Sequence, residues 1–267
     1  NTKLNFKIHN NDEKSSKEKN LIKIQKLRTL IESSKRPLIL AGTGIRISST
    51  EKDLIRFSKD LNIPIATAWT HDLIESKSEL FAGRPGTIGT RPGNFCLQNC
   101  DLLIVLGSRL NIRQTGFNFE GFAKKAKVVH VDVDKSELNK FYLRSQIKIN
   151  SDLKTFFKEI SSIKIKIEKG QFDNWIKWCV KINKEYSIEK EKFCKEKPNT
   201  LNPYKAIINI SDALNEDDII VCGNASACII PFQTIQIKKG QRLFSNSGSA
   251  SMGYDLPAAI GAGIAVR

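Results

Sequence analysis

The chain has 267 residues, of which 40% are apolar, so it is long enough for one complete domain and part of a second. Its formal net charge of +15 at pH 7 comes mostly from Lys spread over polar helices and linkers, without the Arg-rich or aromatic-interleaved segment of a nucleic-acid-binding surface. No run approaches the roughly 20 apolar residues that span a bilayer, so neither a membrane nor a nucleic acid is an expected partner.

The N-terminal part predicts a linker followed by a helix. Residues 1–19 are polar without regular spacing and are expected to be irregular. The apolar residues that follow recur at helical spacing: Leu21, Ile24, Leu27 and Ile31. This helix is expected to end near Ser33, ahead of Pro37. Because the chain lacks an initiator Met and a signal-peptide pattern, Asn1 is expected to be a cut end.

Residues 20–160 predict one doubly wound α/β domain. Short apolar runs alternate with helical patterns and are bounded by Gly, Pro or Asp: Pro37–Gly42, Pro64–Trp69, Asp101–Gly107, Val128–Val133 and Gln146–Ile149. Continuous rather than alternating apolar runs indicate strands buried on both faces, and hence a parallel sheet covered by helices.

Residues 161–202 predict a linker that contains a long helix, with an apolar stripe from Phe172 to Phe193. Residues 203–267 predict a second α/β unit, which begins with a helix at Tyr204–Leu214 and has strands at Asp218–Cys222 and around Leu243. This unit has too few strands for a whole domain and is expected to be truncated.

Two glycine-containing loops of the first domain are candidate anion sites. Gly42-Thr-Gly44 follows a strand and precedes a helix expected near Ser48, so its amides could face a phosphate. The motif lacks the third Gly of a dinucleotide fingerprint, because Ile47 stands there, and a tight turn explains the glycines equally well.

The second loop, Gly107–Gly116, leaves the most hydrophobic strand at its carboxyl end, where open α/β sheets bind ligands. Arg109 and Arg113 could clamp a diphosphate, and Asp132 at the end of the next strand suits a ribose. Alternatively, the two arginines pair with Asp132 or Asp134 to hold the loops together.

The chain ends on its most informative segment, Ser245–Arg267. A polar turn of small residues leads to Met252, the only Met in the chain, and then to a helix rich in Ala and Gly. Such a helix predicts a close packing neighbour.

In order, these segments resemble the acetolactate synthase family of thiamine-diphosphate (ThDP) enzymes. The likeness covers roughly residues 30–145 and 200–267 and is carried by Arg36–Gly42, Asn62–Ala66, Gly83–Gly86, Asp101–Arg109, Ala126–Asp134 and Gly248–Ala262. It implies a central domain with a six-stranded doubly wound parallel sheet, followed by the truncated start of the ThDP-binding domain.

The resemblance assigns roles to the loops of both units. Around a flavin, Gly107, Ser108, Arg109 and Arg113 would line the diphosphate side of FAD, and Asp132 would approach its adenosine end. The family usually has an acid where this chain has Asn111, and several relatives have lost FAD, so FAD stays open as a cofactor.

For ThDP the resemblance implies two short loops. The cofactor diphosphate would meet Gly223, Asn224, Ala225 and Ser226, and the aminopyrimidine would meet Ala250, Ser251 and Met252. In the family the bulky third side chain of the latter loop bends ThDP into a V shape, for which a long, adaptable Met is suited.

Two sets of residues that the family's chemistry requires are not assigned to any position of this chain. Its activating Glu belongs to an N-terminal domain, and its Mg²⁺ ligands are expected after Arg267. We therefore assign no catalytic or metal-binding residue in this chain, and expect the fragment alone to be inactive.

The intact enzyme is expected to use ThDP and Mg²⁺ to decarboxylate a 2-oxo acid such as pyruvate and to transfer the acyl carbanion to an acceptor carbonyl. Gly83–Gly89 and Asn111–Gln114 differ from a branched-chain amino-acid synthase, so a sugar-derived acceptor is open. Alternatives are another ThDP enzyme, such as a 2-oxo acid decarboxylase or oxidase, and a non-catalytic nucleotide-binding module.

By analogy with the family, a homodimer or homotetramer is expected. The six Cys form no CxxC pair, which suits reduced thiols in a cytoplasmic protein.

Overall fold

A parallel sheet dominates the computed structural model, which describes residues 10–69, 71–195 and 198–266. The strand order is β2-β1-β3-β4-β5, and every pair is parallel. The strands are β1 (Pro37–Ala41), β2 (Ile65–Thr67), β3 (Leu102–Leu106), β4 (Lys127–Asp132) and β5 (Ile147–Asn150). All five predicted runs are therefore strands, and the α/β class is confirmed.

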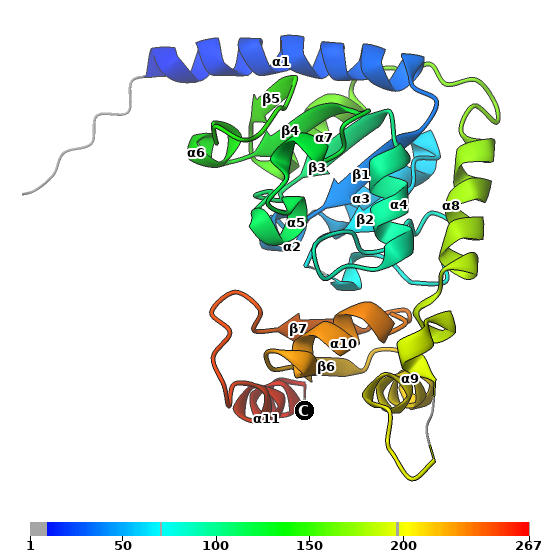
Figure 1. The fold of residues 1–267 in the computed structure, drawn as a ribbon. Helices are drawn as coiled ribbons and strands as arrows, with labels where there is room; N and C mark the ends of the chain where they lie inside the picture. The colour runs from blue at the N-terminus through cyan, green and yellow to red at the C-terminus, as the bar shows by residue number, and fades with distance from the viewer. Residues whose placement is uncertain (1–9, 70, 196–197, 267) are drawn as a thin grey trace, which may run out of the picture.

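Helices cover both faces of this sheet (Figure 1). One face packs against α1 (Asn10–Ser33), α3 (Glu51–Leu61) and α7 (Leu153–Ser161), and the other against α4 (Arg91–Asn99) and α8 (Asp173–Glu185). In β3, Ile104 belongs to the first core and Val105 to the second, as expected when successive residues point to opposite faces.

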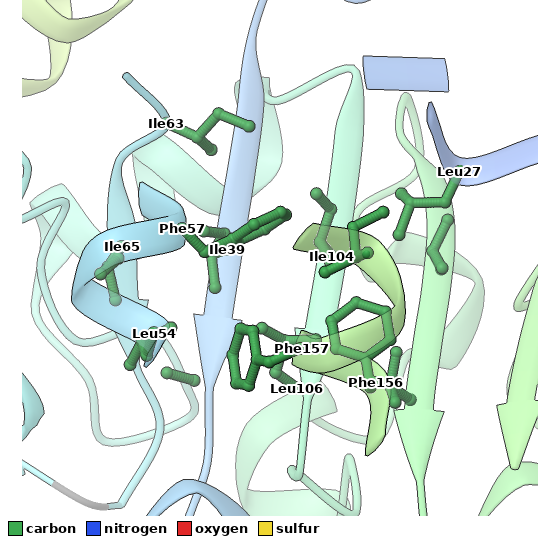
Figure 2. Packing of buried hydrophobic residues seen from close by; sticks show 14 of the residues in the cluster. Leu27, Ile39, Leu54, Phe57, Ile63, Ile65, Ile104, Leu106, Phe156 and Phe157 are labelled. Carbon is green, nitrogen blue, oxygen red and sulfur yellow. The ribbon is translucent and has the colours of Figure 1, made fainter. Parts of the chain in front are cut away.

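The first core is built around aromatic side chains. Phe57 of α3 and Phe156 and Phe157 of α7 meet edge-on, with ring centroids 5.4–6.5 Å apart. Figure 2 shows these rings over Ile39 and Ile104 of the central strands. In the second core, Trp175 donates its indole N–H to the carbonyl of Pro37 at 2.8 Å.

The sheet has five strands rather than the six that the resemblance implied. Beyond β2, the described residues add only an isolated parallel bridge, between Ile65 and Phe81. The chain then turns away at Gly83, whose φ is +93°, and Pro85 has no N–H to continue the pairing. The edge position is therefore occupied by a single bridge.

Three local predictions were wrong. Residues 10–19, expected to be irregular, form the first turns of α1, while residues 1–9 lie outside the described part. Because no Gly or Pro interrupts residues 10–33, a helix nucleated by the packed part of α1 can extend through them. The helix near Ser48 is instead the short α2 (Gly44–Ile47), which ends at Ser48 before α3 begins.

The long helix predicted up to Phe193 stops at Glu185. Its stripe continues in two 3₁₀ turns, η3 (Ile188–Lys190) and η4 (Lys192–Cys194). The α-helix ends where Tyr186 packs edge-on against Phe95 of α4, with 5.1 Å between the ring centroids.

The second unit has two parallel strands, β6 (Ile219–Cys222) and β7 (Arg242–Ser245), joined through α10 (Ser226–Thr234). It also contains two further helices, α9 (Pro203–Ala213) and α11 (Asp255–Ala265). Figure 1 shows this unit beside the first sheet, with α9 leading into it from the end of α8. The two units are joined by hydrogen bonds: buried Arg84 donates to the carbonyl of Phe232 at 3.0 Å, and the amide of Ser76 donates to the carbonyl of Ile237 at 2.9 Å.

The remaining short elements are η1 (His71–Leu73), α5 (Ile112–Thr115), η2 (Phe119–Gly121) and α6 (Lys135–Leu138). All six Cys are buried free thiols. Within the described ranges, no helix is long and apolar enough to cross a membrane.

Candidate functional site

Two loops meet back to back at the carboxyl ends of β1 and β3. The amide of Gly44 donates to the carbonyl of Gly107 at 2.9 Å. A Cβ on Gly42 would lie 2.4 Å from the carbonyl oxygen of Gly107, and one on Gly44 would lie 2.7 Å from its Cα. The two glycines thus allow one loop to touch the other, which explains the Gly-Thr-Gly motif through packing.

A cleft of about 940 Å³ opens above these loops. Its first wall comes from the carboxyl ends of β1, β3 and β4, and its second from residues 242–245, 247 and 248 of the second unit. This volume is at the upper end of what ligand pockets have, roughly 300–1,000 Å³. All five residues predicted to face a nucleotide line it: Gly107, Ser108, Arg109, Arg113 and Asp132.

Ser108 and Arg109 are neighbours on the first wall of the cleft, but they differ in their hydrogen-bond partners. The carbonyl of Ser108 accepts a hydrogen bond from Nε2 of buried His130 at 2.8 Å, which places the imidazole proton on Nε2. Burial lowers the pKa of His130, so this ring is neutral. The Arg109 guanidinium is exposed and has no hydrogen-bond or ion-pair partner among the described residues, so it is available to an anion.

The guanidinium of Arg113 already contacts other groups of the protein. Its guanidinium donates to the carbonyl of Ser247 at 2.7 Å and lies over the ring of Trp69, 5.6 Å from the centroid. The backbone amide of Arg113 donates to the side chain of Asn111, which caps α5. Asn111 therefore has a local structural role at the position where the family usually has an acid.

Asp132 and Asp134 bond to backbone rather than to arginine. The Asp132 carboxylate accepts from the amide of Asp134 at 2.9 Å, and that of Asp134 accepts from the amide of Ser136 at 2.7 Å, capping α6. No ion pair of the described residues joins either carboxylate to Arg109 or Arg113. The alternative in which the arginines hold these loops through the aspartates is therefore wrong.

The two loops assigned to ThDP lie against each other. The Asn224 side chain donates to the carbonyl of Ala250 at 2.7 Å, although the residues are 26 positions apart. Ala225 and Ala250 both adopt left-handed backbone, with φ of 47° and 54°. Strain of this kind persists only where the surroundings enforce it, and it is common at ligand-binding sites.

The other residues of these loops differ in exposure. A Cβ on Gly223 would lie 2.8 Å from the Asp255 carboxylate, so the end of β6 packs closely on the start of α11. Ser226 opens α10 and is exposed, as is Ser251, whose carbonyl accepts from Asn246 at 3.2 Å. Met252 is 88% exposed, and its backbone forms no hydrogen bond to any described residue.

The close neighbour expected for the Ala- and Gly-rich helix is absent from the described residues. A Cβ on Gly261 or Gly263 would meet nothing within 4 Å. Leu256, Ile260 and Ile264, at four-residue spacing along α11, are 55–69% exposed. The apolar face of this helix is thus open in the described chain.

Sequence reasoning missed a buried polar cluster at the junction of the two units. The Asp72 side chain, only 2% exposed, accepts from Nε of Arg242 at 2.7 Å and from the amide of Leu243 at 3.2 Å. Arg46 lies 3.3 Å from the same carboxylate and also pairs with Glu51. No local pattern marks these residues, because Asp72 and Arg242 are 170 positions apart.

No group of three or more His, Cys, Asp or Glu side chains within residues 10–69, 71–195 and 198–266 could hold a metal ion. The predicted ligand-binding residues thus lie in two parts of the described chain, the cleft and the paired loops.

Comparison with known proteins decides the family. Residues 24–160 match the family described as thiamine pyrophosphate enzyme, central domain. The chain belongs to the thiamine pyrophosphate enzymes. The matched range ends at α7, so the family assignment rests on the sheet that forms the first wall of the cleft.

Among curated proteins, this chain is similar to acetolactate synthase large subunits. It is 30% identical over 251 residues to a probable large subunit of Methanocaldococcus jannaschii, covering 91% of this chain and 42% of that protein. It is 32% identical over 264 residues to the large subunit of Lactococcus lactis, covering 98% of this chain and 44% of the relative. A large subunit of Cyanidium caldarium is also 32% identical, over 247 residues. The chain thus spans less than half the length of these relatives.

Proposed function

We propose that this protein acts in a ThDP- and Mg²⁺-dependent, acetolactate synthase-like enzyme, which decarboxylates a 2-oxo acid such as pyruvate and transfers the acyl unit to an acceptor carbonyl. Family membership and the similarity to acetolactate synthases support the reaction class. Since the matched region is less than half of each relative, the proposal assigns the activating Glu and the Mg²⁺ ligands to further parts of the enzyme.

The observation that carries the proposal is the pairing of the two cofactor loops. Asn224 ties the turn after β6 to Ala250, and both loops contain an alanine in left-handed backbone. A loop held in this way presents its following residues in a defined direction. Those residues include Met252, whose side chain and backbone groups are all free to meet a ligand.

The residues present fit ThDP on this observation. The free backbone of Met252, together with that of Ala250, would hydrogen-bond the aminopyrimidine, and the Met252 side chain would fill the bend of the cofactor. Asn224 and Ser226 would lie on the diphosphate side, at the N-terminus of α10. When bound, ThDP supplies the electron sink for loss of CO₂ from the 2-oxo acid.

The test is made on the intact protein. ThDP is titrated in the presence of Mg²⁺ by calorimetry, and CO₂ release from pyruvate is measured together with the identity of the product. Metal-dependent ThDP binding with CO₂ release supports the proposal. Acetolactate as the only product would contradict a sugar-derived acceptor, whereas acetaldehyde or acetyl phosphate would favour a decarboxylase or an oxidase.

Substitutions at Met252 make the test specific. Burying a Met side chain is worth about 1.5–3 kcal/mol, so Met252→Ala is expected to weaken ThDP binding roughly 10- to 100-fold. Met252→Leu keeps the bulk and should bind within a few-fold of wild type. Ile210→Ala, at a 52% exposed position of α9, is the matched control and should bind normally. Equal ThDP affinity for all three variants would contradict the assigned role of Met252.

A second ligand is favoured by the cleft. We propose that it binds the diphosphate of FAD or of another adenine nucleotide, with Arg109 as the anion-binding side chain and Asp132 at the ribose. Gly107 and Ser108 would form the floor. The absorption spectrum of the purified protein tests for flavin, and Arg109→Gln should lower nucleotide affinity at least tenfold. ADP or FAD binding without any ThDP binding would instead favour a non-catalytic nucleotide-binding module.

The intact enzyme is also proposed to be a homodimer or homotetramer. Light scattering coupled to gel filtration measures this directly, and a monomer at micromolar concentration would contradict it.

A further inference from the structure

The segment that precedes the aminopyrimidine loop is held by the first sheet unit at two points. At the first, the buried carboxylate of Asp72 binds the start of β7 through the Arg242 side chain, at 2.7 Å, and the Leu243 amide, at 3.2 Å. Arg46 supports this carboxylate from α2 at 3.3 Å. A buried carboxylate with three donors has little freedom to move, because each donor removed leaves an unpaired polar group.

At the second point, Arg113 donates to the carbonyl of Ser247 at 2.7 Å. Its guanidinium is oriented by the ring of Trp69, 5.6 Å from the centroid, and its backbone is held by the cap of α5. A charged donor on a peptide carbonyl makes a stronger bond than a neutral one. This contact lies only three residues before Ala250.

Hydrogen bonds within residues 246–251 fix the position of the ThDP loop relative to Ser247. The amide of Ala250 donates to the carbonyl of Asn246 at 2.8 Å, and the Asn246 side chain donates to the carbonyl of Ser251 at 3.2 Å. Residues 246–251 therefore form one turn, and a shift of Ser247 must displace the turn as a whole.

We propose that Asp72 and Arg113 are positioning residues for the ThDP loop, which hold the segment 242–247 so that Ala250–Met252 faces the cofactor. The expected effect on ThDP binding rests on the proposed function, but the hydrogen bonds that hold residues 242–247 do not require a bound ligand. It gives Arg113 a different task from the diphosphate clamp expected from the sequence.

The two tethers also line the 940 Å³ cleft. A ligand in the cleft that contacts Asp72 or Arg113 acts on the same bonds that hold the ThDP loop. By linkage, such a ligand and ThDP must change each other's affinity by the same factor. The proposal therefore predicts coupling between the cleft and the cofactor loop through Asp72 and Arg113.

The first measurement is hydrogen–deuterium exchange of peptides covering residues 245–254 in the intact protein without added cofactor. Arg113→Gln removes the charged donor and is expected to raise their exchange rate at least tenfold. Arg113→Lys can still reach the carbonyl and should restore part of the protection. Arg109→Gln, in the same loop but with a side chain that meets no hydrogen-bond or ion-pair partner in the described part of the chain, should leave the exchange unchanged.

The second measurement is binding. Arg113→Gln should weaken ThDP about tenfold, seen as a raised KM for ThDP with a smaller change in kcat, while FAD and ADP lose less affinity than they do in Arg109→Gln. Arg109→Gln should show the reverse pattern. Asp72→Asn should act like Arg113→Gln, and thermal unfolding shows whether it folds; if it does not, the arginine variants alone decide.

The proposal is overturned if Arg113→Gln leaves the exchange of residues 245–254 at the wild-type rate, whatever its effect on ligands. A loss of nucleotide affinity in Arg113→Gln equal to that in Arg109→Gln, with the loop unchanged, would make Arg113 an anion clamp. A wild-type protein that binds no ThDP would remove the proposed function, while the exchange comparison would still decide whether the tether exists.

Discussion

The contact between the two glycine loops makes a sharp prediction for Gly42→Ala. The backbone of Gly42 is outside the left-handed region, so Ala can adopt it without conformational strain. The added Cβ would lie 2.4 Å from the Gly107 carbonyl oxygen and 2.6 Å from the Cα of Ser108. These are backbone atoms at the end of β3, which cannot rotate away as a flexible side chain would.

The expected loss of stability follows from how far the two loops must move apart to relieve the close contact. Ordinary contact begins near 3.4 Å, so the loops must separate by about 1 Å. Overpacking of this kind costs about 1–3 kcal/mol, and the upper end applies because both loops belong to the sheet. Ala in place of Gly recovers about 0.4–1 kcal/mol through the unfolded chain. The net loss of about 2 kcal/mol should lower the melting temperature by about 4–8 °C.

Thermal unfolding followed by circular dichroism measures this loss, with ADP and FAD affinity as the second readout. Gly261→Ala is the matched control, because a Cβ there meets nothing within 4 Å. In the interior of α11 it should stabilise by up to about 1 kcal/mol. A Gly42→Ala protein that melts at or above the wild-type temperature would refute the packing explanation of the motif.

Three further predictions concern the core and the junction. Phe156→Ala, at a fully buried site in α7, should cost about 3–5 kcal/mol in urea unfolding, and Phe156→Leu clearly less. Trp175→Phe leaves the buried carbonyl of Pro37 without its donor and should cost about 1–3 kcal/mol in the same assay. Burial, and then the nearby charge of Arg84, lowers the pKa of His71 well below 6.5, so the unfolded chain takes up this proton first as the pH falls. The free energy of unfolding should therefore fall as the pH drops below about 6.5, by up to about 1.4 kcal/mol per pH unit from this group. His71→Phe should reduce this slope between pH 6.5 and 5.5. An unchanged slope would contradict the lowered pKa of His71.

The open stripe on α11 has a practical consequence for these experiments. Met252, Leu256, Ile260 and Ile264 are all more than half exposed and recur every four residues in the chain's last segment. Exposed apolar patches promote association. Stability measurements should therefore be repeated at several protein concentrations, so that self-association is not mistaken for folding stability.

Local pattern was enough for much of the fold. All five strands of the first sheet and both strands of the second were predicted within two residues at each end, because a strand buried on both faces needs a continuous apolar run. The edge was not predictable in this way. Whether Phe81 begins a sixth strand depends on the turn at Gly83 and on Pro85, and the resemblance alone pointed to six.

Helix ends were predicted less well. The start of α1 and the end of α8 lie in Lys- and Glu-rich stretches, where polar residues suit a helix and a linker equally. Packing beyond the local segment decides such cases. The five lysines expected on solvated faces within Lys14–Lys26 therefore gave no boundary signal.

For the site, the sequence by itself predicted which loops would carry the chemistry: Gly107–Arg113 at the end of a buried strand, and Ala250–Met252 after a polar turn. Only the tertiary structure decided their partners. Arg113 binds Ser247, 134 positions away, and Asp72 binds Arg242, 170 positions away. The side chains of a local segment show that a charge exists, but whether it meets a ligand, a carboxylate or a peptide carbonyl depends on how the two units pack. That packing is a property of the whole folded chain.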